Sequence, residues 1–160
     1  MRQVISILLF VFVFASSFAQ SSLPNITIKD LKNKPVNISQ KYSEKDKIYV
    51  FSFWATWCAP CISELEAINE YYEDWSEELN MELIAISTDD SRTQRRVRPM
   101  LSGKAWPYEV LMDSNQELKR ALSIVNIPYS IVVKNNKIEH IFNGYTQGAE
   151  HELYEVLKAL

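Results

Sequence analysis

The chain of 160 residues is 47% hydrophobic and 23% charged, a composition that excludes a low-complexity polymer and is typical of one globular domain with its own core. Its formal net charge of −3 argues against sequence-independent binding of nucleic acid, which depends on many Lys and Arg contacts to phosphates, and its three glycines form no Gly-rich phosphate loop. Two cysteines and two histidines, His140 and His151, lack the spacing of a four-ligand zinc site, so we expect no metal, no cofactor and no nucleic-acid partner.

The first nineteen residues have the layout of a secretory signal peptide. Arg2 supplies a positive charge, the segment Val4–Ala15 is apolar except for one serine, and Ser17 and Ala19 supply the small residues of a cleavage site. The apolar run is shorter than the about 20 residues of a transmembrane helix, and an uncleaved membrane anchor is the alternative. We therefore expect residues 1–19 to be a signal peptide and the mature protein to be exported, to the periplasm of a bacterium.

The rest of the chain, residues 20–160, has no repeat, linker or change of composition, which predicts a single domain. Its first segment, Leu23–Ser39, predicts an extended arm folded into a hairpin by a turn at Lys32–Pro35. The apolar run Ile48–Trp54 then predicts a buried strand. One amphipathic helix should follow, because apolar residues recur at helical spacing at Leu65, Ile68, Tyr72, Trp75 and Leu79.

The second half of the chain continues to alternate strands and helices. In chain order we expect a strand over Leu83–Ser87, a helix over Ser91–Met100, a strand over Tyr108–Met112, a helix over Asn115–Ser123, a strand over Ile131–Val133, a hairpin turn at Asn135 and Asn136, a strand over Lys137–Phe142 and a helix over Glu150–Leu160. The last helix should turn Leu153, Val156, Leu157 and Leu160 inward. This alternation predicts an α/β fold with a mainly parallel sheet covered by helices on both faces, and the final hairpin adds an antiparallel edge that makes the sheet mixed.

The chemistry of the chain is expected at its only two cysteines, Cys58 and Cys61, which lie between the first buried strand and the helix after it. Cys58 falls at the start of the helix, where free N–H groups and the helix dipole stabilise a thiolate, whereas Cys61 lies one turn further and is shielded. Such a C-x-x-C pair lowers a thiol pKa from about 8.5 to about 7 or below. Pro60 suits the first turn because no N–H donor is needed there.

Two structural readings compete with redox chemistry at this pair. Half of a zinc site would need a second pair of ligands, which the sequence does not offer. A purely structural disulfide would close a ring over so few residues that it removes little entropy from the unfolded chain. The position between a strand and a helix favours a redox-active dithiol.

The motif FWATWCAPC, together with Ile127-Pro128 and a Gly144 followed by a helix, resembles the thioredoxin superfamily. Within it, the chain resembles the exported TlpA/ResA-type thiol–disulfide oxidoreductases from Leu23 to the C-terminus. The narrower resemblance rests on the N-terminal arm, the export signal, Glu64 three residues after Cys61, and the 67 residues from Cys61 to Pro128. It implies a thioredoxin-like fold with an N-terminal β-hairpin and an inserted strand–helix segment.

The resemblance also implies roles for individual residues. Cys58 and Cys61 would form the redox-active disulfide, and Glu64 would be an active-site acid. Pro128 would follow a cis peptide bond and face the disulfide, and the backbone of Ile127 would bind an extended substrate. Trp57, next to Cys58 in the chain, is expected to be partly exposed and to face the substrate.

The sequence departs from the family pattern at two positions near the motif. Glu66 stands where the family usually has proline, and Ser52 stands on the strand where plain thioredoxins carry a buried acid. The second departure removes one proton relay and gives Glu64 more weight. Eight acidic and no basic residues lie between Ile62 and Glu82, namely Glu64, Glu66, Glu70, Glu73, Asp74, Glu77, Glu78 and Glu82. Most should form a solvated face, and their field should disfavour a very acidic Cys58, as in a reductant.

A basic cluster contrasts with these acids in the segment 92–98. It consists of Arg92, Arg95, Arg96 and Arg98. The sequence supports two interpretations of it, an exposed helix face that balances the acidic one and a docking patch for an acidic partner.

We therefore expect an exported, monomeric thiol–disulfide reductase in which Cys58 attacks a substrate disulfide and Cys61 resolves the mixed disulfide. By resemblance its partners are disulfide-containing proteins, with apocytochrome c as one candidate, and a membrane-bound electron donor. The alternatives are a disulfide oxidase or isomerase, a thiol peroxidase, for which no T-x-x-C motif is present, and a non-catalytic, chaperone-like binding module.

Overall fold

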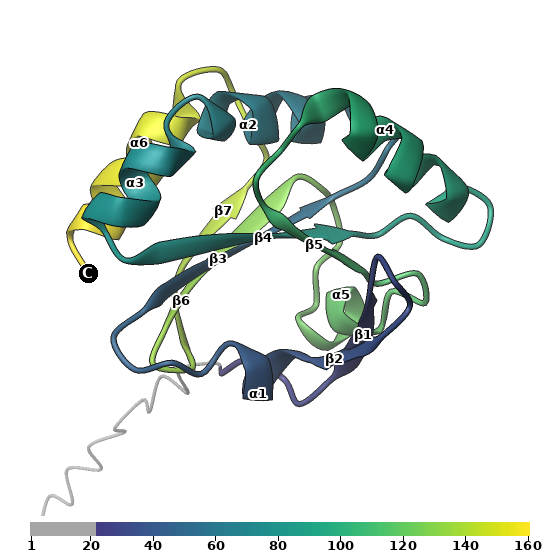
Figure 1. Ribbon diagram of the computed structural model, residues 1–160. Coiled ribbons are helices and arrows are strands. Elements are labelled where there is room, and N and C mark those ends of the chain that lie inside the picture. Colours follow the sequence, from purple (N-terminus) through teal and green to yellow (C-terminus); the bar gives the residue numbers. More distant parts are fainter. Residues whose placement is uncertain (1–21) are drawn as a thin grey trace, which may run out of the picture.

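A computed structural model describes residues 22–160, and the predicted signal peptide therefore lies outside the described residues. Seven strands form one sheet in the order β2-β1-β5-β4-β3-β6-β7. Helices α2, α3, α4 and α6 cover one face of this sheet, and α1 and α5 cover the other (Figure 1). The expected thioredoxin-like α/β fold with a mixed sheet is confirmed.

The expected elements appear in the predicted order with shifted ends, and a short helix that was not predicted, α1, begins at the end of the expected extended arm. They are β1 (Thr27–Asp30), β2 (Pro35–Asn37), α1 (Ile38–Lys41), β3 (Ile48–Trp54), α2 (Ala59–Asn69), α3 (Tyr72–Glu78), β4 (Met81–Ser87), the 3₁₀ helix η1 (Gln94–Arg96), α4 (Val97–Lys104), β5 (Glu109–Met112), α5 (Glu117–Ala121), β6 (Tyr129–Lys134), β7 (Lys137–Asn143) and α6 (Ala149–Lys158). The N-terminal hairpin is confirmed as β1 and β2. Helix α4 begins only at Val97, later than the residue at which the sequence predicts it, after the turns around η1.

The expectation of a mainly parallel sheet is wrong. Only β3 with β4 and β4 with β5 are parallel, and the other four neighbouring pairs are antiparallel. A parallel continuation after β5 would need a crossover long enough to return the chain to the other end of the sheet. Helix α5 has five residues, a rise of about 7.5 Å, and the chain makes no such return: β6 starts at the end of the sheet where β5 stops and runs antiparallel to β3.

The helix after the cysteines is broken in two, although its apolar spacing continues from Leu65 to Leu79. The N–H of Tyr71 donates to the carbonyl of Ile68, three residues back, in a tight turn between α2 and α3. The turn sets α3 at a new angle that buries Trp75, and the ring of Tyr71 stacks on Trp75 with centroids 5.5 Å apart. The spacing of apolar residues cannot reveal this bend because both helices face the same core.

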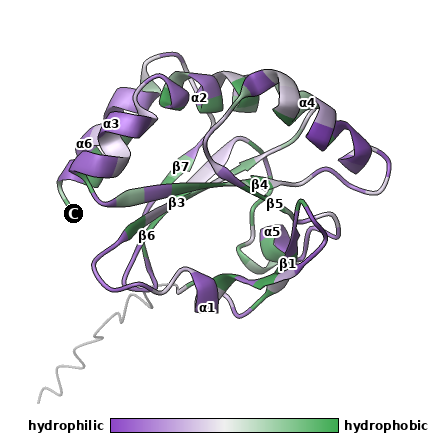
Figure 2. Cartoon of the chain, in the orientation of Figure 1, coloured by the Kyte–Doolittle hydropathy of each residue, from purple (hydrophilic) through white to green (hydrophobic). Residues whose placement is uncertain are grey.

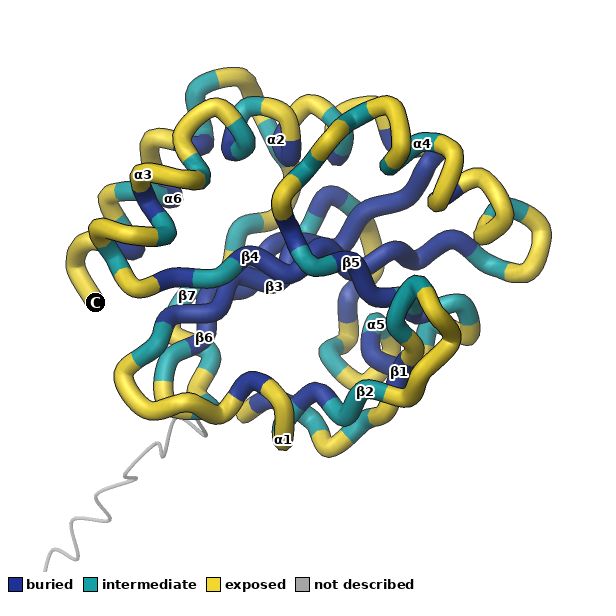
Figure 3. The backbone as a smooth tube through the Cα atoms, viewed as in Figure 1, coloured by how far each residue is buried: buried dark blue, intermediate teal, exposed yellow. Residues whose placement is uncertain are grey.

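Strand β3 lies in the middle of the molecule and is buried along its whole length (Figure 3). Its side chains alternate between the two faces, with Val50 and Trp54 under α2 and Phe51 and Phe53 on the side of α1. Helices α3 and α6 show mostly hydrophilic residues on the side seen in Figure 2. The two cores therefore fix β3 from both sides, and its C-terminal end is a rigid base for the residues that follow.

The end of the chain matches the prediction except at its last residue. Asn135 and Asn136 form the hairpin turn with φ of 51° and 64°, and the register of β6 and β7 shifts at a bulge beside Val132 and Val133. Helix α6 buries Leu153 and Leu157. Leu160 lies beyond the end of α6 and is 38% exposed, so the expectation that it turns inward is wrong.

The side chains of the basic cluster at residues 92–98 are all exposed. Arg92 pairs with Asp90 at 2.6 Å, and the guanidinium of Arg98 donates to the carbonyl oxygen of Leu31, which ties α4 to the N-terminal hairpin. A docking role for the cluster stays a prediction. Within residues 22–160, no helix is long and apolar enough to cross a membrane.

Candidate functional site

The two cysteines lie where β3 passes into α2. After Trp54 the chain makes a turn in which the N–H of Cys58 donates to the carbonyl of Ala55 at 3.0 Å. Cys58 then caps the N-terminus of α2, and Pro60 occupies the first turn of the helix, as predicted. Cys58 and Cys61 form a disulfide with their Cα atoms 5.3 Å apart. The sulfur of Cys58 is thus held at the end of α2 where the free N–H groups point.

The surroundings of the disulfide are unequally exposed. Trp57 is 60% exposed, as predicted, whereas Cys58 retains only 5% and Cys61 none of its surface. In the disulfide form Cys58 is therefore nearly as buried as Cys61, although it stands at the start of the helix. The order of exposure still agrees with Cys58 as the cysteine that a partner reaches first.

The segment before β6 reaches the same end of the sheet. The Ile127–Pro128 peptide bond is cis, as the resemblance implies, and Tyr129 pairs with Phe53 at the C-terminal end of β3. Ile127 packs against the hydrophobic cluster that contains both cysteines. The topology therefore brings Ile127 and Pro128 to the C-terminal end of β3, the end of the sheet that carries the disulfide. Their contact with substrate stays a prediction.

Glu64 lies in the interior and is 6% exposed. The hydroxyl of Ser52 donates to its Oε2 atom at 3.1 Å, and the hydroxyl of Ser130 donates to its Oε1 atom at 3.1 Å. Ser52 and Ser130 are direct partners in the pairing of β3 with β6. Glu64 thus places a carboxyl from α2 beside Ser52, the strand position at which plain thioredoxins carry a buried acid by resemblance. The sequence gives no sign of this role for Ser130, since nothing local to it signals a contact 66 residues away.

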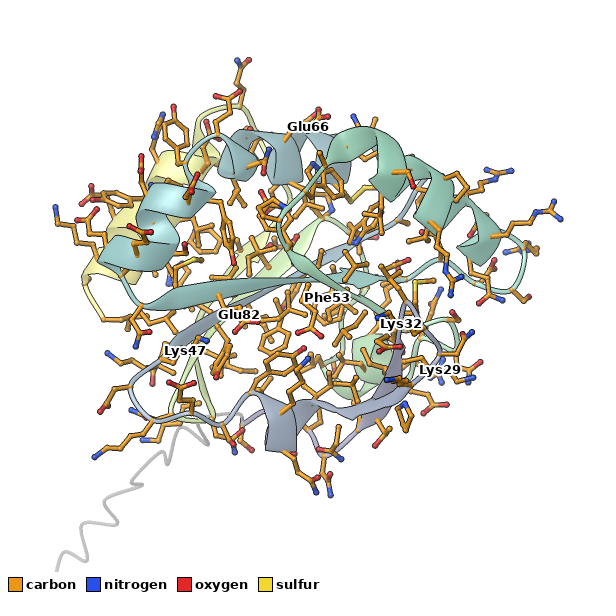
Figure 4. All side chains as sticks on the ribbon, in the orientation of Figure 1. Lys29, Lys32, Lys47, Phe53, Glu66 and Glu82 are labelled. Carbon is orange, nitrogen blue, oxygen red and sulfur yellow. A yellow bond between two sulfur atoms is a disulfide. The ribbon has the colours of Figure 1, made fainter. Side chains whose placement is uncertain are left out.

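The other acids of this region are different from Glu64. Six of the eight are exposed, as the prediction of a solvated face requires, and Glu82 is half-buried. Glu66, labelled in Figure 4, points away from the sheet and pairs with Lys104. Glu82 lies beside Lys47, with 2.8 Å between the charged atoms. Glu64 is therefore the one acid of this set that is buried, and it lies one helical turn after Cys61 on α2.

Burial raises the pKa of Glu64 to about 7, although the hydrogen bonds from Ser130 and Ser52 favour the carboxylate and lower the pKa in part. A group with a pKa near neutrality holds and releases a proton at similar cost. This is the property of an efficient general acid–base at physiological pH.

The raised pKa of Glu64 predicts that stability depends on pH in a defined window. From about pH 4.5 to about pH 7 the folded protein holds a proton that the unfolded chain has released, so the free energy of unfolding falls as pH rises, by about 3 kcal/mol in all. Glu64→Gln keeps the shape of the neutral carboxyl but has no proton to release. Its free energy of unfolding should therefore not fall between about pH 4.5 and about pH 7. We expect the disulfide forms of the two proteins to be similarly stable at low pH and the variant to be more stable above about pH 8 in urea unfolding. Parallel stability curves for wild type and variant would contradict the raised pKa.

A second buried acid, Asp89, holds the loop before the cysteines and was also missed from the sequence. Its carboxylate accepts hydrogen bonds from the N–H of Thr56 at 2.8 Å, from the hydroxyl of Thr56 at 2.6 Å and from the hydroxyl of Ser87 at 3.0 Å. The N–H of Thr88 donates to the carbonyl of Trp54 at 2.8 Å. The end of β4 therefore fixes the backbone two residues before Cys58.

In the part of the chain that the structure describes, no group of three His, Cys, Asp or Glu side chains is placed to hold a metal ion.

Comparisons with known proteins agree with this arrangement. The family model described as AhpC/TSA family matches residues 19–141. The thiol-disulfide oxidoreductase ResA of Bacillus thuringiensis subsp. konkukian is 27% identical over 138 residues, which cover 86% of this chain and 75% of the relative.

Two solved structures extend the comparison. A thioredoxin-like protein from Porphyromonas gingivalis has a TM-score of 0.75 and 40% identity, over 86% of this chain and 90% of that one. A secreted disulfide oxidoreductase of Mycobacterium tuberculosis, described as homologous to E. coli DsbE, has a TM-score of 0.68 and 17% identity, over 85% of this chain and 96% of that one. The second match shows the fold alone.

Proposed function

The chain belongs to the AhpC/TSA family and is a thiol–disulfide oxidoreductase of ResA/DsbE type, and on this premise we propose that it acts as an exported reductase of protein disulfides. One observation supports this proposal above the others. A buried carboxyl with a pKa of about 7, Glu64, lies one helical turn after the buried cysteine of a C-x-x-C pair. Such a group can take the proton of the second thiol at the moment when that thiol must become a nucleophile.

The proposed reaction starts from the dithiol form. The thiolate of Cys58 attacks one sulfur of the substrate disulfide, and the other sulfur leaves as a thiolate that takes a proton from water. Glu64 then accepts the proton of Cys61, and the Cys61 thiolate attacks the sulfur of Cys58. The mixed disulfide breaks, the second substrate sulfur leaves as a thiolate that takes a proton from water, and two electrons have passed from the cysteine pair to the substrate.

Substrate binding is proposed at the exposed surface around the disulfide. Trp57 offers a largely exposed ring next to Cys58. Ile127 and Pro128 lie at the same edge of the sheet, where the backbone of Ile127 would pair with an extended substrate segment. Disulfide-containing proteins are therefore the proposed substrates, with apocytochrome c as a candidate on resemblance alone.

The cellular setting is proposed from the sequence and from the relatives. Residues 1–19 would direct export and be removed, and a relative in the solved structures is described as secreted. In an oxidising compartment the disulfide form must be reduced again, for which we propose a membrane-bound electron donor. The mature protein would act as a monomer without a cofactor.

The reduction potential of the Cys58–Cys61 pair tests the direction of electron transfer. The acids of α2 and α3 oppose a strongly stabilised thiolate on Cys58, so we expect a value nearer about −270 mV than about −120 mV. Equilibration with glutathione buffers of defined ratio, followed by trapping of free thiols, measures it. A value above about −180 mV would favour the disulfide oxidase or isomerase instead.

A further inference from the structure

A small cavity adjoins the buried carboxyl of Glu64 on the side away from β3. Its volume is about 20 Å³, and its polar lining consists of Glu64, Ser130, Tyr145 and Glu150. Phe142 and Leu153 are among its apolar lining residues. A site of this volume with several polar groups has room for one hydrogen-bonded water molecule. The cavity therefore connects Glu64, which comes from α2, with polar groups at the start of α6.

The far end of this cavity is a hydrogen-bonded pair that leads toward solvent. The hydroxyl of Tyr145 donates to the Oε2 atom of Glu150 at 2.9 Å, and the N–H of Gly148 donates to the same atom at 3.1 Å. Glu150 is 8% exposed. Its Oε1 atom lies 4.0 Å from Nε2 of His151, whose side chain is 66% exposed. Glu150 thus stands between the cavity and the exterior.

The titratable groups that face Glu64 come from four parts of the fold. Cys61 precedes it on α2, Tyr108 comes from the residue before β5, Tyr145 from the loop before α6, and Glu150 from α6 itself. Burial of Tyr145, its hydrogen bond to Glu150 and the charges of Glu150 and Glu64 raise the pKa of Tyr145 to about 12. Tyr145 therefore stays protonated at neutral pH, and its hydroxyl can pass a proton only by exchanging hydrogen bonds.

We propose that Tyr145 and Glu150 form the route by which protons pass between Glu64 and solvent through this cavity. The inference rests on the proposed function, in which Glu64 takes one proton from Cys61 during each reduction of a substrate. Below about pH 7 Glu64 already holds a proton and must lose it before it can take the proton of Cys61, and the buried carboxyl cannot release it directly to water. It passes through the cavity water and the Tyr145 hydroxyl to the carboxylate of Glu150 and from there to solvent, and no electrons move in this step. Tyr145 and Glu150 act on the reaction only through Glu64, and they are therefore positioning residues and not catalytic ones.

The test follows one turnover of the reduced protein with a chromophoric aromatic disulfide, 5,5′-dithiobis(2-nitrobenzoate), by rapid mixing. The first thiolate released reports the attack of Cys58, and the second reports the attack of Cys61. Below about pH 7, Glu64 starts protonated in most molecules and must lose its proton before Cys61 can react. We expect Glu150→Gln and Tyr145→Phe to slow the second release about tenfold below that pH and to leave it unchanged well above it. Imidazole, a small proton carrier, should restore the rate.

Controls separate this result from structural damage and from simple electrostatics. Glu152→Gln removes the same charge from an exposed position in the first turn of α6 and should behave as wild type at every pH. If Glu150→Gln acted only by removing a negative charge, it would lower the pKa of Glu64 and favour its carboxylate. The second release would then become faster at low pH, the opposite of the expected effect. Slowing at all pH values, or slowing that imidazole does not relieve, would overturn the inference.

Glu64→Gln, measured in parallel, distinguishes the two levels of the proposal. If it leaves the second release at the wild-type rate, the acid–base role of Glu64 fails and the proton route fails with it. If it slows the second release while Glu150→Gln and Tyr145→Phe match wild type below about pH 7, only the route through the cavity is wrong.

Discussion

Cys58→Ser is expected to abolish disulfide reduction, whereas Cys61→Ser should trap the substrate in a covalent mixed disulfide. The expectation follows from the unequal positions of the two sulfurs. Cys58 caps α2 beside the exposed Trp57, where the helix N-terminus stabilises its thiolate, and Cys61 is fully buried. Without Cys58 no attack occurs. Without Cys61 the first attack proceeds, but nothing resolves its product.

Non-reducing gel electrophoresis after incubation with a disulfide-containing protein measures both outcomes. Free-thiol counts on the same samples report whether the substrate has been reduced. The variant with both cysteines replaced by serine is the matched control, and captured substrate in that variant would support the non-catalytic binding module. Trapping by Cys58→Ser and not by Cys61→Ser would show that the two roles are exchanged.

Glu64→Gln is expected to lower the rate at which Cys61 resolves the mixed disulfide by about 10²–10⁴-fold, the usual contribution of a general acid–base group. In the wild type, the resolving rate should rise with pH through about 7, as Glu64 loses its proton and becomes a base. The variant should lack this rise, because its amide cannot accept a proton. Above about pH 7, loss of the negative charge should also lower the pKa of Cys58.

Rapid mixing across a pH series measures the resolving rate, and the ultraviolet absorbance of the thiolate measures the pKa of Cys58. Glu66→Gln is a matched control on the same helix, since Glu66 is exposed and pairs with Lys104 instead of facing the core. Equal rates and superimposable titrations for Glu64→Gln and wild type would leave Glu64 with only a structural part in α2.

The features that could be predicted from sequence depend on residues close together in the chain. The buried run of β3 and the adjacent C-x-x-C pair give the strand, the loop and the start of α2 directly. The cis bond before Pro128 came from family resemblance and not from spacing, since most X–Pro bonds are trans.

The features that could not be predicted depend on contacts between distant residues. Resemblance singles out Glu64 from the eight acids, but only the pairing of β3 with β6 brings Ser52 and Ser130 to its carboxyl. Asp89 lies 33 residues from Thr56 and joins it only when β4 lies beside β3. The reversed direction of β6 likewise depends on its pairing with β3, since the apolar pattern within a strand is the same in either direction.

The two outer strands of the sheet, β2 and β7, also affect how the protein behaves at high concentration. An open strand edge is a template for intermolecular pairing, which leads to aggregation. At one edge of the sheet, strand β2 is only three residues long and starts with Pro35, which has no N–H to donate. At the other edge, a bulge distorts the pairing of β7 with β6, and Ser22 forms a bridge to Lys137, the first residue of β7. Both outer strands are therefore poor templates for adding a second copy of the chain to the sheet.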